Sequence, residues 1–203
     1  MGDWVEKRLG EIGVTFNGLT GKSAADFGTG KSRYITFLNV LNNPIIDLTI
    51  LEKVDVRIGE KQNAVKRNDL LFNTSSETPE EVGICSVLLD DVDDVYLNSF
   101  CFGYRLTDDE VLGLYLAYFF RCKDGRNLMT TLAQGSTRYN LSKDSFLKSL
   151  VVMPSTKKEQ FAIAEVLSDM DAEIAALEAK RAKYEQVKNG MMQELLTGKI
   201  RLV

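Results

Sequence analysis

The segment Pro154-Ser155-Thr156-Lys157-Lys158-Glu159, which follows the apolar run Leu150-Val151-Val152-Met153, decides the fold. Proline breaks regular structure, while Thr156 and Glu159 have the spacing in which a threonine hydroxyl and a glutamate cap the first turn of a helix. A helix is therefore predicted to start there, and Gly198 is the residue type that ends helices. The break at Pro154 divides the chain into residues 1–153 and 154–203.

The predicted helix carries an apolar seam whose members are alternately four and three residues apart. This heptad pattern is typical of helices that pair in coiled coils. The dimer or partner seam consists of Ile163, Leu167, Met170, Ile174, Leu177, Tyr184, Met191 and Leu195, and basic residues occupy the seam positions Arg181 and Lys188. A helix of roughly 40 residues is about 60 Å long, which is longer than a small domain can cover.

Two interpretations of the seam stay open at this stage. The helix pairs with a second copy or with a partner subunit, or it folds back along its own domain. The number of heptads favours pairing. Basic seam residues favour an antiparallel or a heteromeric arrangement, in which Arg181 and Lys188 can meet acidic side chains.

Upstream of Pro154, short β-rich runs are separated by clusters of Gly, Asn, Asp and Ser, which is the pattern of strands joined by turns. The predicted strands are 12–16, 34–40, 54–58, 70–73, 83–89, 95–106 and 149–153. Residues 111–122 and 127–133 are predicted helices, and the first is apolar nearly all round, as buried helices are. We expect an α/β (mixed α+β) globular domain followed by a long C-terminal coiled-coil-forming α-helix.

Composition excludes several kinds of chemistry. The 203 residues are 44% hydrophobic and include no histidine, so a core can form but a Ser-His-Asp triad and an H-E-x-x-H zinc site cannot. Cys85, Cys101 and Cys122 are far apart and odd in number, which indicates small core residues of a reduced, cytoplasmic protein. No apolar stretch is long enough for a membrane span, so we expect no membrane partner.

The net charge of −4 is unevenly distributed along the chain. Residues 77–110 contain ten acidic residues and a single basic residue, Arg105. The rest of residues 1–153 contains 16 basic and 11 acidic residues, so a basic face can coexist with an acidic one. The overall charge therefore does not argue against a nucleic-acid partner.

Two motifs suggest chemistry but lack essential parts. Residues 26–32 (Asp-Phe-Gly-Thr-Gly-Lys-Ser) end like a phosphate-binding loop, yet Ala25 occupies the position of the first glycine, and a surface loop is favoured. The Asn/Asp-Pro-Pro-Tyr/Phe motif of methyltransferases is missing. The acidic run 90–94 lacks the glycine and the closing glutamate of a calcium loop, so a turn between strands is favoured. We expect no metal and no cofactor.

Residues 134–142 (Gln-Gly-Ser-Thr-Arg-Tyr-Asn-Leu-Ser) are more informative. This stretch, predicted as a loop between two helical segments, combines hydroxyl, amide, guanidinium and phenol groups, which contact phosphates and base edges in DNA complexes. A helix-capping turn, with Ser136 or Asn140 as the cap, is an equal alternative. The same two readings apply to residues 73–76 (Asn-Thr-Ser-Ser).

Together these motifs resemble a known family, the DNA specificity subunit (HsdS or S subunit) of type I restriction-modification systems. The resemblance covers essentially the whole chain and is most specific in its C-terminal part. It rests on Trp4-x-x-x-x-Leu9-Gly10-Glu11-Ile12, Gly18–Gly21, Asn68–Asn73, Val82-Gly83, Gly135–Thr137, Met153-Pro154, Gln160-x-x-Ile163-Ala164-x-x-Leu167-x-x-Met170-Asp171 and Gln193–Arg201.

The resemblance implies a target recognition domain (residues 1–153) and a conserved-region spacer or dimerisation helix (residues 154–203). It implies a non-catalytic chain that binds double-stranded DNA and docks methyltransferase subunits and, through them, the restriction subunit. Family members normally contain two recognition domains and two such helices, and this sequence contains one of each. It therefore suggests either a half-subunit that forms a homodimer on a palindromic site or a fragment of a longer subunit.

Expected DNA contacts come from the basic and hydroxyl-rich stretches. They are Lys22, Lys31, Arg33, Ser75, Ser136, Thr137, Arg138 and Tyr139. Two alternative functions remain: a stand-alone DNA methyltransferase or nuclease, and a coiled-coil adaptor whose globular part binds protein.

Overall fold

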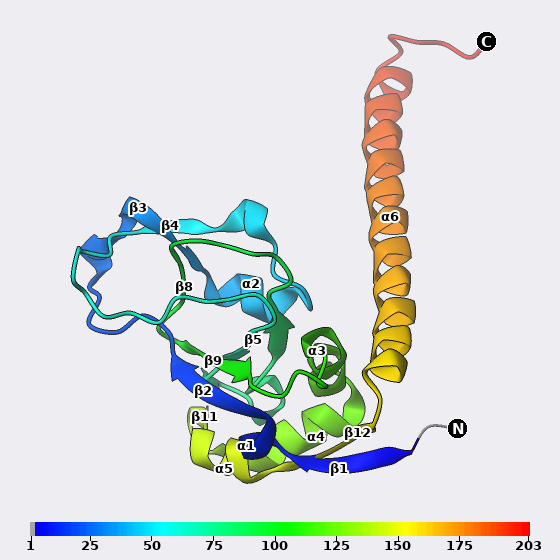
Figure 1. The fold of residues 1–203 in the computed structure, drawn as a ribbon. Helices are drawn as coiled ribbons and strands as arrows, with labels where there is room; N and C mark the ends of the chain where they lie inside the picture. Colours follow the sequence, from blue (N-terminus) through cyan, green and yellow to red (C-terminus); the bar gives the residue numbers. More distant parts are fainter. Residues whose placement is uncertain (1–2) are drawn as a thin grey trace. The chain divides into compact units, whose positions relative to one another are not determined.

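The structure is a computed structural model that describes residues 3–203 (Figure 1). Its contacts divide the chain into two compact units, a globular unit that ends at Ala162 and a helical unit, Ile163–Val203. The globular unit has the mixed α/β architecture that the sequence predicts, and the second unit contains most of the predicted long helix.

A four-stranded antiparallel sheet forms the centre of the globular unit. Its strands, in spatial order, are β2 (Gly13–Asn17), β9 (Cys101–Leu106), β5 (Leu70–Asn73) and β7 (Cys85–Val87). All four residues of β5 are buried, as expected for a central strand. The helices α3 (Gly113–Arg121), α4 (Lys123–Leu132) and α5 (Lys143–Lys148) follow this sheet in the sequence, and α3 packs on β7 and β5.

An aromatic cluster joins this sheet to the helices. The Phe146 ring on α5 lies edge-on to the rings of Phe72 and Tyr104, with centroids 5.2 Å apart in both pairs. Phe102 stacks on Phe72 at 5.1 Å, and Phe120 of α3 meets Phe72 edge-on at 5.2 Å. These geometries are the favoured ones for aromatic pairs, so the cluster fixes α3 and α5 against the sheet.

A second, mixed sheet has the order β4 (Glu52–Val54), β3 (Phe27–Ile35) and β8 (Val95–Leu97). β3 is antiparallel to β4 and parallel to β8. Tyr34 packs with Leu19 and Val54 on one side, while Ile35 belongs to a larger core with Val40 and Leu71.

Two small sheets complete the unit. β6 (Ser75–Ser76), β10 (Ala133–Gln134) and β11 (Tyr139–Leu141) form one of them, and β1 (Trp4–Arg8) with β12 (Leu150–Pro154) forms the other. The antiparallel register of the second runs from Trp4 opposite Pro154 to Arg8 opposite Leu150. The start of the domain is thereby tied to the strand that precedes the long helix.

Short helices lie between the strands: α1 (Leu9–Ile12), α2 (Phe37–Asn42), and the 3-10 turns η1 (Ala24–Asp26), η2 (Leu48–Ile50) and η3 (Pro79–Glu81). The prediction of one strand over residues 34–40 was wrong, because β3 ends at Ile35 and α2 begins. The side chain of Thr36 accepts a hydrogen bond from the Asn39 backbone N–H at 3.2 Å and caps this helix. The cap overrides the β-branched composition of the run.

Three other predictions need correction. The predicted strand over residues 95–106 is two strands, β8 and β9, separated by a turn in which Asn98 accepts the Phe100 N–H. Of the predicted strand over residues 54–58, only Val54 is in a strand, as the last residue of β4. Cys85 and Cys101 are buried as predicted, but Cys122 is exposed because it lies between α3 and α4.

The long helix α6 spans Lys157–Leu196, and both of its predicted ends are confirmed. The Thr156 hydroxyl accepts a hydrogen bond from the Glu159 backbone N–H at 3.4 Å. Gly198 has φ +72° and its N–H bonds the Leu195 carbonyl at 3.2 Å, which is the usual geometry of a helix end. Among the described residues, no helix combines the length and the apolar character needed to cross a bilayer.

We predict that Phe146→Ala lowers the free energy of unfolding by about 3–5 kcal/mol, because the residue is fully buried and contacts several aromatic rings. Urea titration followed by circular dichroism measures this change. Phe100→Ala is the matched control, because this ring is mostly exposed. Equal unfolding midpoints for the two variants would contradict the described core.

Candidate nucleic-acid interface

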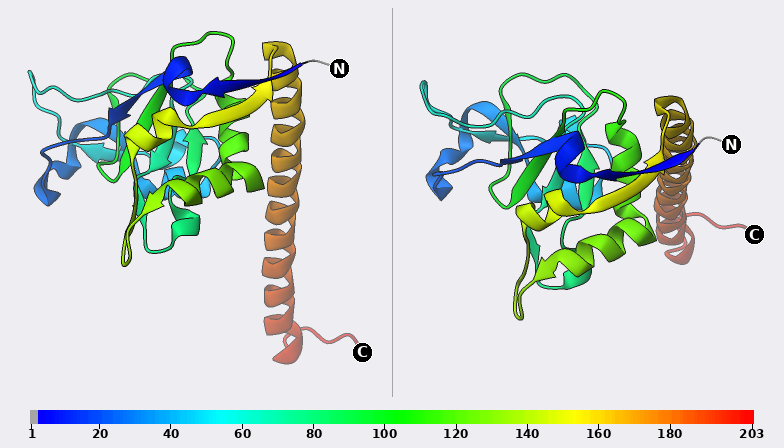
Figure 2. Two further views of the ribbon diagram at one scale, coloured as in Figure 1. Left: turned by 90° about the horizontal axis from the view of Figure 1, so that it is seen from below. Right: turned by 60° about the horizontal axis from the view of Figure 1, so that its bottom comes forward.

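The eight predicted DNA-contacting residues lie in two separate regions of the globular unit. Ser75 and residues 136–139 belong to the β10–β11–β6 sheet and its hairpin tip, whereas Lys31 and Arg33 are on β3 and Lys22 lies in the loop before η1. Figures 1 and 2 show these sheets at different ends of the globular unit. The sequence thus identified two candidate contact regions, which are described in turn.

The first region lies between two helices, α4 and α5, as predicted, but it is a β-hairpin and not a loop, so that part of the prediction was wrong. β10 pairs with β11, and β11 pairs on its other side with β6, where Asn140 lies opposite Ser75 and Tyr139 opposite Ser76. The predicted helix over residues 127–133 is α4, which starts four residues earlier, at Lys123. The cap of the next helix is Ser142, whose hydroxyl accepts the Ser145 N–H at 3.3 Å, so neither Ser136 nor Asn140 has that role.

The hairpin brings together residues from both polar stretches that the sequence singled out. Nε of Arg138 donates a hydrogen bond to the Ser75 hydroxyl at 3.1 Å, across 63 residues of sequence. Ser136, Thr137 and Arg138 are exposed, and Tyr139 is half-buried. The terminal nitrogens of the Arg138 guanidinium have no partner among the described residues, so its fork is held at one nitrogen and free at the other two. This geometry suits recognition of an acceptor pair.

Two residues, Asn73 and Gly135, hold the backbone of this sheet and its hairpin in place. The buried Asn73 side chain donates to the Glu81 and Ser75 carbonyls at 2.8 and 3.3 Å and accepts from the Ile84 N–H at 2.6 Å. At the hairpin tip, Gly135 has φ +140°, and a Cβ there would lie 2.2 Å from the Arg138 carbonyl oxygen. Glycine is therefore required for the tip to close.

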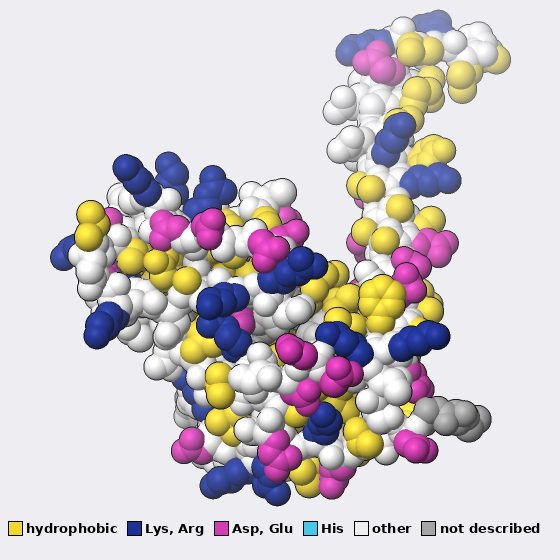
Figure 3. All heavy atoms as spheres, viewed as in Figure 1, with side chains coloured by type: hydrophobic (Ala, Val, Ile, Leu, Met, Phe, Trp, Pro, Cys, Tyr) yellow, Lys and Arg dark blue, Asp and Glu magenta, His cyan; other side chains and the backbone are white. Residues whose placement is uncertain are grey.

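The second region is a basic surface on the β3–β4 pair. Arg33 lies directly opposite Lys53 in the antiparallel register, and Lys31 is two residues before Arg33 on the same strand. All three side chains are exposed and have no hydrogen bond or ion pair among the described residues. Figure 3 shows Lys and Arg side chains gathered at this end of the domain. Like charges opposite each other repel, so a bound anion would stabilise this arrangement.

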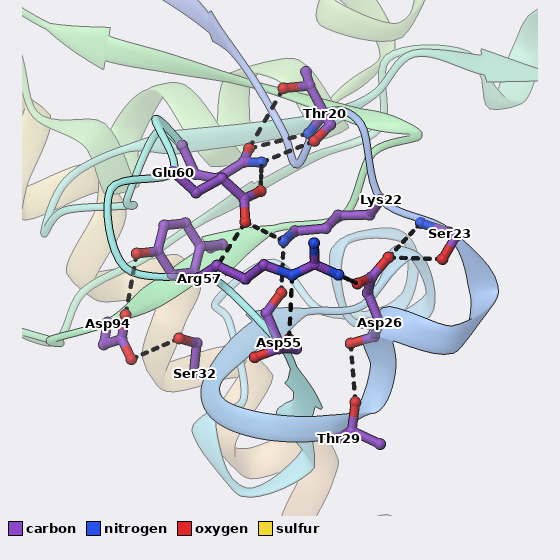
Figure 4. A network of polar contacts seen from close by, with 12 residues as sticks. Thr20, Lys22, Ser23, Asp26, Thr29, Ser32, Asp55, Arg57, Glu60 and Asp94 are labelled. Carbon is purple, nitrogen blue, oxygen red and sulfur yellow. Dashed lines mark hydrogen bonds and ion pairs between the residues drawn. The ribbon is translucent and has the colours of Figure 1, made fainter.

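Lys22 occupies a different environment from Lys31 and Arg33. Its side chain is 4% exposed, and its ammonium donates to the Glu60 carboxylate at 2.6 Å and to the Asp55 carbonyl at 2.5 Å (Figure 4). The Lys22 ammonium therefore joins the loop before η1 to the loop after β4. This geometry favours a structural role for Lys22, and we leave it out of the proposed interface.

Around Lys22 is a polar network that the sequence analysis missed. Glu60 also accepts from the Arg57 N–H at 3.1 Å and from the Gln62 amide, and these bonds with Lys22 lower the pKa of Glu60 to about 2. Ser23 donates two hydrogen bonds to Asp26 and lowers the pKa of that carboxyl group, and Arg57 lies 3.5 Å from it. In the sequence, the signal for a turn at residues 57–60 is Gly59, which lies between the charged residues Arg57 and Glu60.

The described residues offer no clear place for a metal ion, since no group of three or more Cys, Asp or Glu side chains has metal-binding geometry there. The acidic run 90–94 lies between β7 and β8, where the sequence predicted a turn. Within it, Asp94 accepts a hydrogen bond from Ser32 at 2.7 Å, which ties the turn to β3.

Comparison with known proteins agrees with the fold and with the sequence resemblance. Residues 1–188 match the family of the type I restriction modification DNA specificity domain, and the chain belongs to this family. A curated relative from Methanocaldococcus jannaschii, which carries the name of a type I restriction enzyme MjaX specificity subunit, is 26% identical over 200 residues, covering 96% of this chain and 46% of the relative.

Solved structures give the same picture of the fold. The S subunit of the Type-I restriction-modification system from M. genitalium superposes with a TM-score of 0.60 at 15% identity, covering 95% of this chain and 46% of that one. The HsdS subunit from Thermoanaerobacter tengcongensis gives a TM-score of 0.59 at 14% identity, covering 94% and 44%. This chain therefore spans about half the length of the relatives that it matches.

We predict that Glu60→Gln destabilises the domain at neutral pH and flattens the acid side of its stability profile. Because the pKa of Glu60 is lowered from an ordinary value near 4.5 to about 2, its stabilising contribution is complete above pH 4.5. That contribution is lost as the pH falls toward 2. Thermal melts from pH 7 to pH 2 measure the effect. Glu77→Gln, at an exposed carboxylate, is the control, and identical profiles for the two variants would refute this role of Glu60.

Proposed function

We propose that this chain is a DNA sequence-recognition module that reads one half of a target site. The observation that carries the proposal is the hydrogen bond between the exposed Arg138 and the buried Ser75, in a chain that belongs to a DNA specificity family. A free guanidinium fork beside hydroxyl groups matches the contacts that read base edges and phosphates in the major groove. We assign this reading role to the hairpin residues Ser136, Thr137, Arg138 and Tyr139. Ser75, which is only 6% exposed, positions Arg138 through its hydroxyl group.

The basic surface on β3–β4 has a different role in this proposal. Lys31, Arg33 and Lys53 are exposed and have no ion pair among the described residues, and such charges bind phosphates without regard to sequence. They orient the domain on the duplex, while the hairpin supplies the selectivity. This division explains how a chain with a net charge of −4 can bind DNA.

We further propose that the chain is non-catalytic and acts in the cytoplasm with methyltransferase subunits and, through them, a restriction subunit. The relatives named above are specificity subunits, and with no histidine any acid–base chemistry would depend on carboxylates, Lys, Tyr or Cys. Incubation of the purified chain with DNA, Mg²⁺ and adenosylmethionine tests this proposal. Reproducible methyl transfer or cleavage by the chain alone would instead favour a stand-alone enzyme.

The long helix is proposed to make the chain a homodimer that recreates a two-domain subunit. Six of the eight seam residues, from Leu167 to Met191, are exposed by 37–64%, and the other two, Ile163 and Leu195, are partly buried. Apolar side chains in a heptad pattern are stabilised when a second helix covers them. Because this chain spans about half the length of its relatives, two copies together span about the length of one of them. The site read by such a dimer is palindromic.

We predict that Arg138→Ala weakens binding to a preferred duplex by about 1–3 kcal/mol and relaxes selectivity, because it removes the free guanidinium fork. Fluorescence anisotropy, with the duplex that the wild-type chain retains best from a random-sequence library, measures this loss. Arg67→Ala is the matched control, since Arg67 is exposed and pairs with Asp91 at 3.4 Å, away from the hairpin. Equal affinities for the two variants would remove Arg138 from the reading surface.

We predict that Leu177→Asp converts the dimer into a monomer, because it places a charge in the centre of the seam. Size-exclusion chromatography with light scattering measures the molar mass of the variant. Ala179→Asp introduces the same residue two positions along α6, away from the seam, and should remain dimeric. A monomeric wild-type chain would contradict the proposed pairing.

A further inference from the structure

Residues 57–60 form a tight surface turn that the proposed function does not yet use. The Glu60 N–H bonds the Arg57 carbonyl at 3.0 Å, and Gly59 has φ +86°. A positive φ at the third residue is the signature of a type II turn, which only glycine adopts without strain. The second residue of such a turn points outward, and in this protein that residue is Ile58.

Ile58 is fully exposed, with a relative accessibility of 108%. Single exposed apolar residues are common on protein surfaces and need no explanation by themselves. This one differs because hydrogen bonds and an ion pair hold the turn beneath it. Glu60 receives hydrogen bonds from the almost fully buried Lys22 and from the Arg57 N–H, so the chain fixes an apolar tip in water.

The tip is flanked by cations. The Arg57 guanidinium is 76% exposed and makes only loose ion pairs, 3.5 Å from Asp26 and 3.8 Å from Asp55. Lys61 is exposed and has no hydrogen bond or ion pair among the described residues. Figure 4 shows Arg57 extending toward Asp26, with Lys22 and Glu60 above it in this view. A cavity of about 570 Å³ opens beside the turn, between it and Thr20–Lys22.

We infer that the turn formed by residues 57–61 is a second DNA-contacting element, which inserts Ile58 into a groove while Arg57 and Lys61 bind the flanking phosphates. An aliphatic side chain on a rigid turn can pack against a thymine methyl group or wedge at a base step. Phosphates satisfy the two cations, whose present partners are weak or absent. This inference rests on the proposed function, because it names a further contact in the same DNA complex.

The experiment measures the affinity of the full chain for its preferred duplex at several salt concentrations. Ile58→Ser should weaken binding about fivefold or more, as loss of one base contact does, without changing the slope of log K against log salt. Arg57→Gln and Lys61→Gln should each reduce that slope by about 0.9, because each removes one phosphate contact. The apolar and ionic contributions are thereby separated.

Two matched variants serve as controls. Ile50→Ser removes an exposed isoleucine on η2, and Arg67→Gln removes an exposed arginine that pairs with Asp91. Both should bind as the wild type does, and thermal melts check that all variants fold. If the wild type binds and Ile58→Ser binds equally well, the inference is overturned while the proposed function stands. If the wild type binds no duplex at any salt concentration, the proposed function fails and the inference with it.

Discussion

The pairing of β1 with β12 is the constraint on which the rest of the architecture depends. It joins the first described strand to the strand that ends at Pro154, so the globular unit closes before α6 begins. Gln160, in the first turn of α6, bonds to the rest of the globular unit. Its buried amide accepts the Leu112 N–H at 2.8 Å and donates to the Glu110 and Pro154 carbonyls at 3.1 and 3.0 Å. A buried side chain with all of these bonds made fixes the first turns of α6 in the globular unit.

The domain presents its polar chemistry on two of its sheets, β10–β11–β6 and β4–β3–β8. In one, a hydrogen-bonded guanidinium keeps a free fork beside hydroxyl groups. In the other, exposed cations lie side by side, next to a turn whose apolar tip is held by the Lys22–Glu60 ion pair. Base readout requires the first kind of surface, and phosphate binding requires the second. The two together account for a DNA-reading role better than either does alone.

The sequence predicted the features that depend on local chemistry. The cap at Thr156, the end of α6 near Gly198, the strand at residues 70–73 and the buried helix after residue 111 are all found. It failed where distant segments decide the local structure. β1 contains few apolar residues and forms because β12 pairs with it, and the hairpin at residues 133–141 forms because β6 receives its edge. No local pattern contains such partners.

In the candidate site, too, the sequence indicated residue types but not the contacts between distant segments. Residue types indicated Ser75, Arg138, Lys31 and Arg33, and the fold leaves Arg138, Lys31 and Arg33 exposed and joins Arg138 to Ser75. Composition could not distinguish Lys22 from its neighbours, because only the fold brings Glu60, 38 residues away, to its ammonium. Arg57 and Ile58 carried no motif, and their importance comes from the geometry of the turn.

The central claim is that two identical chains, joined through α6, read two identical half-sites. Selection of binding sites from a random duplex library by the full chain, followed by sequencing, tests it most directly. The account predicts an enriched inverted repeat with a constant spacing between its halves. Enrichment of a single asymmetric motif, or no enrichment at all, would contradict it.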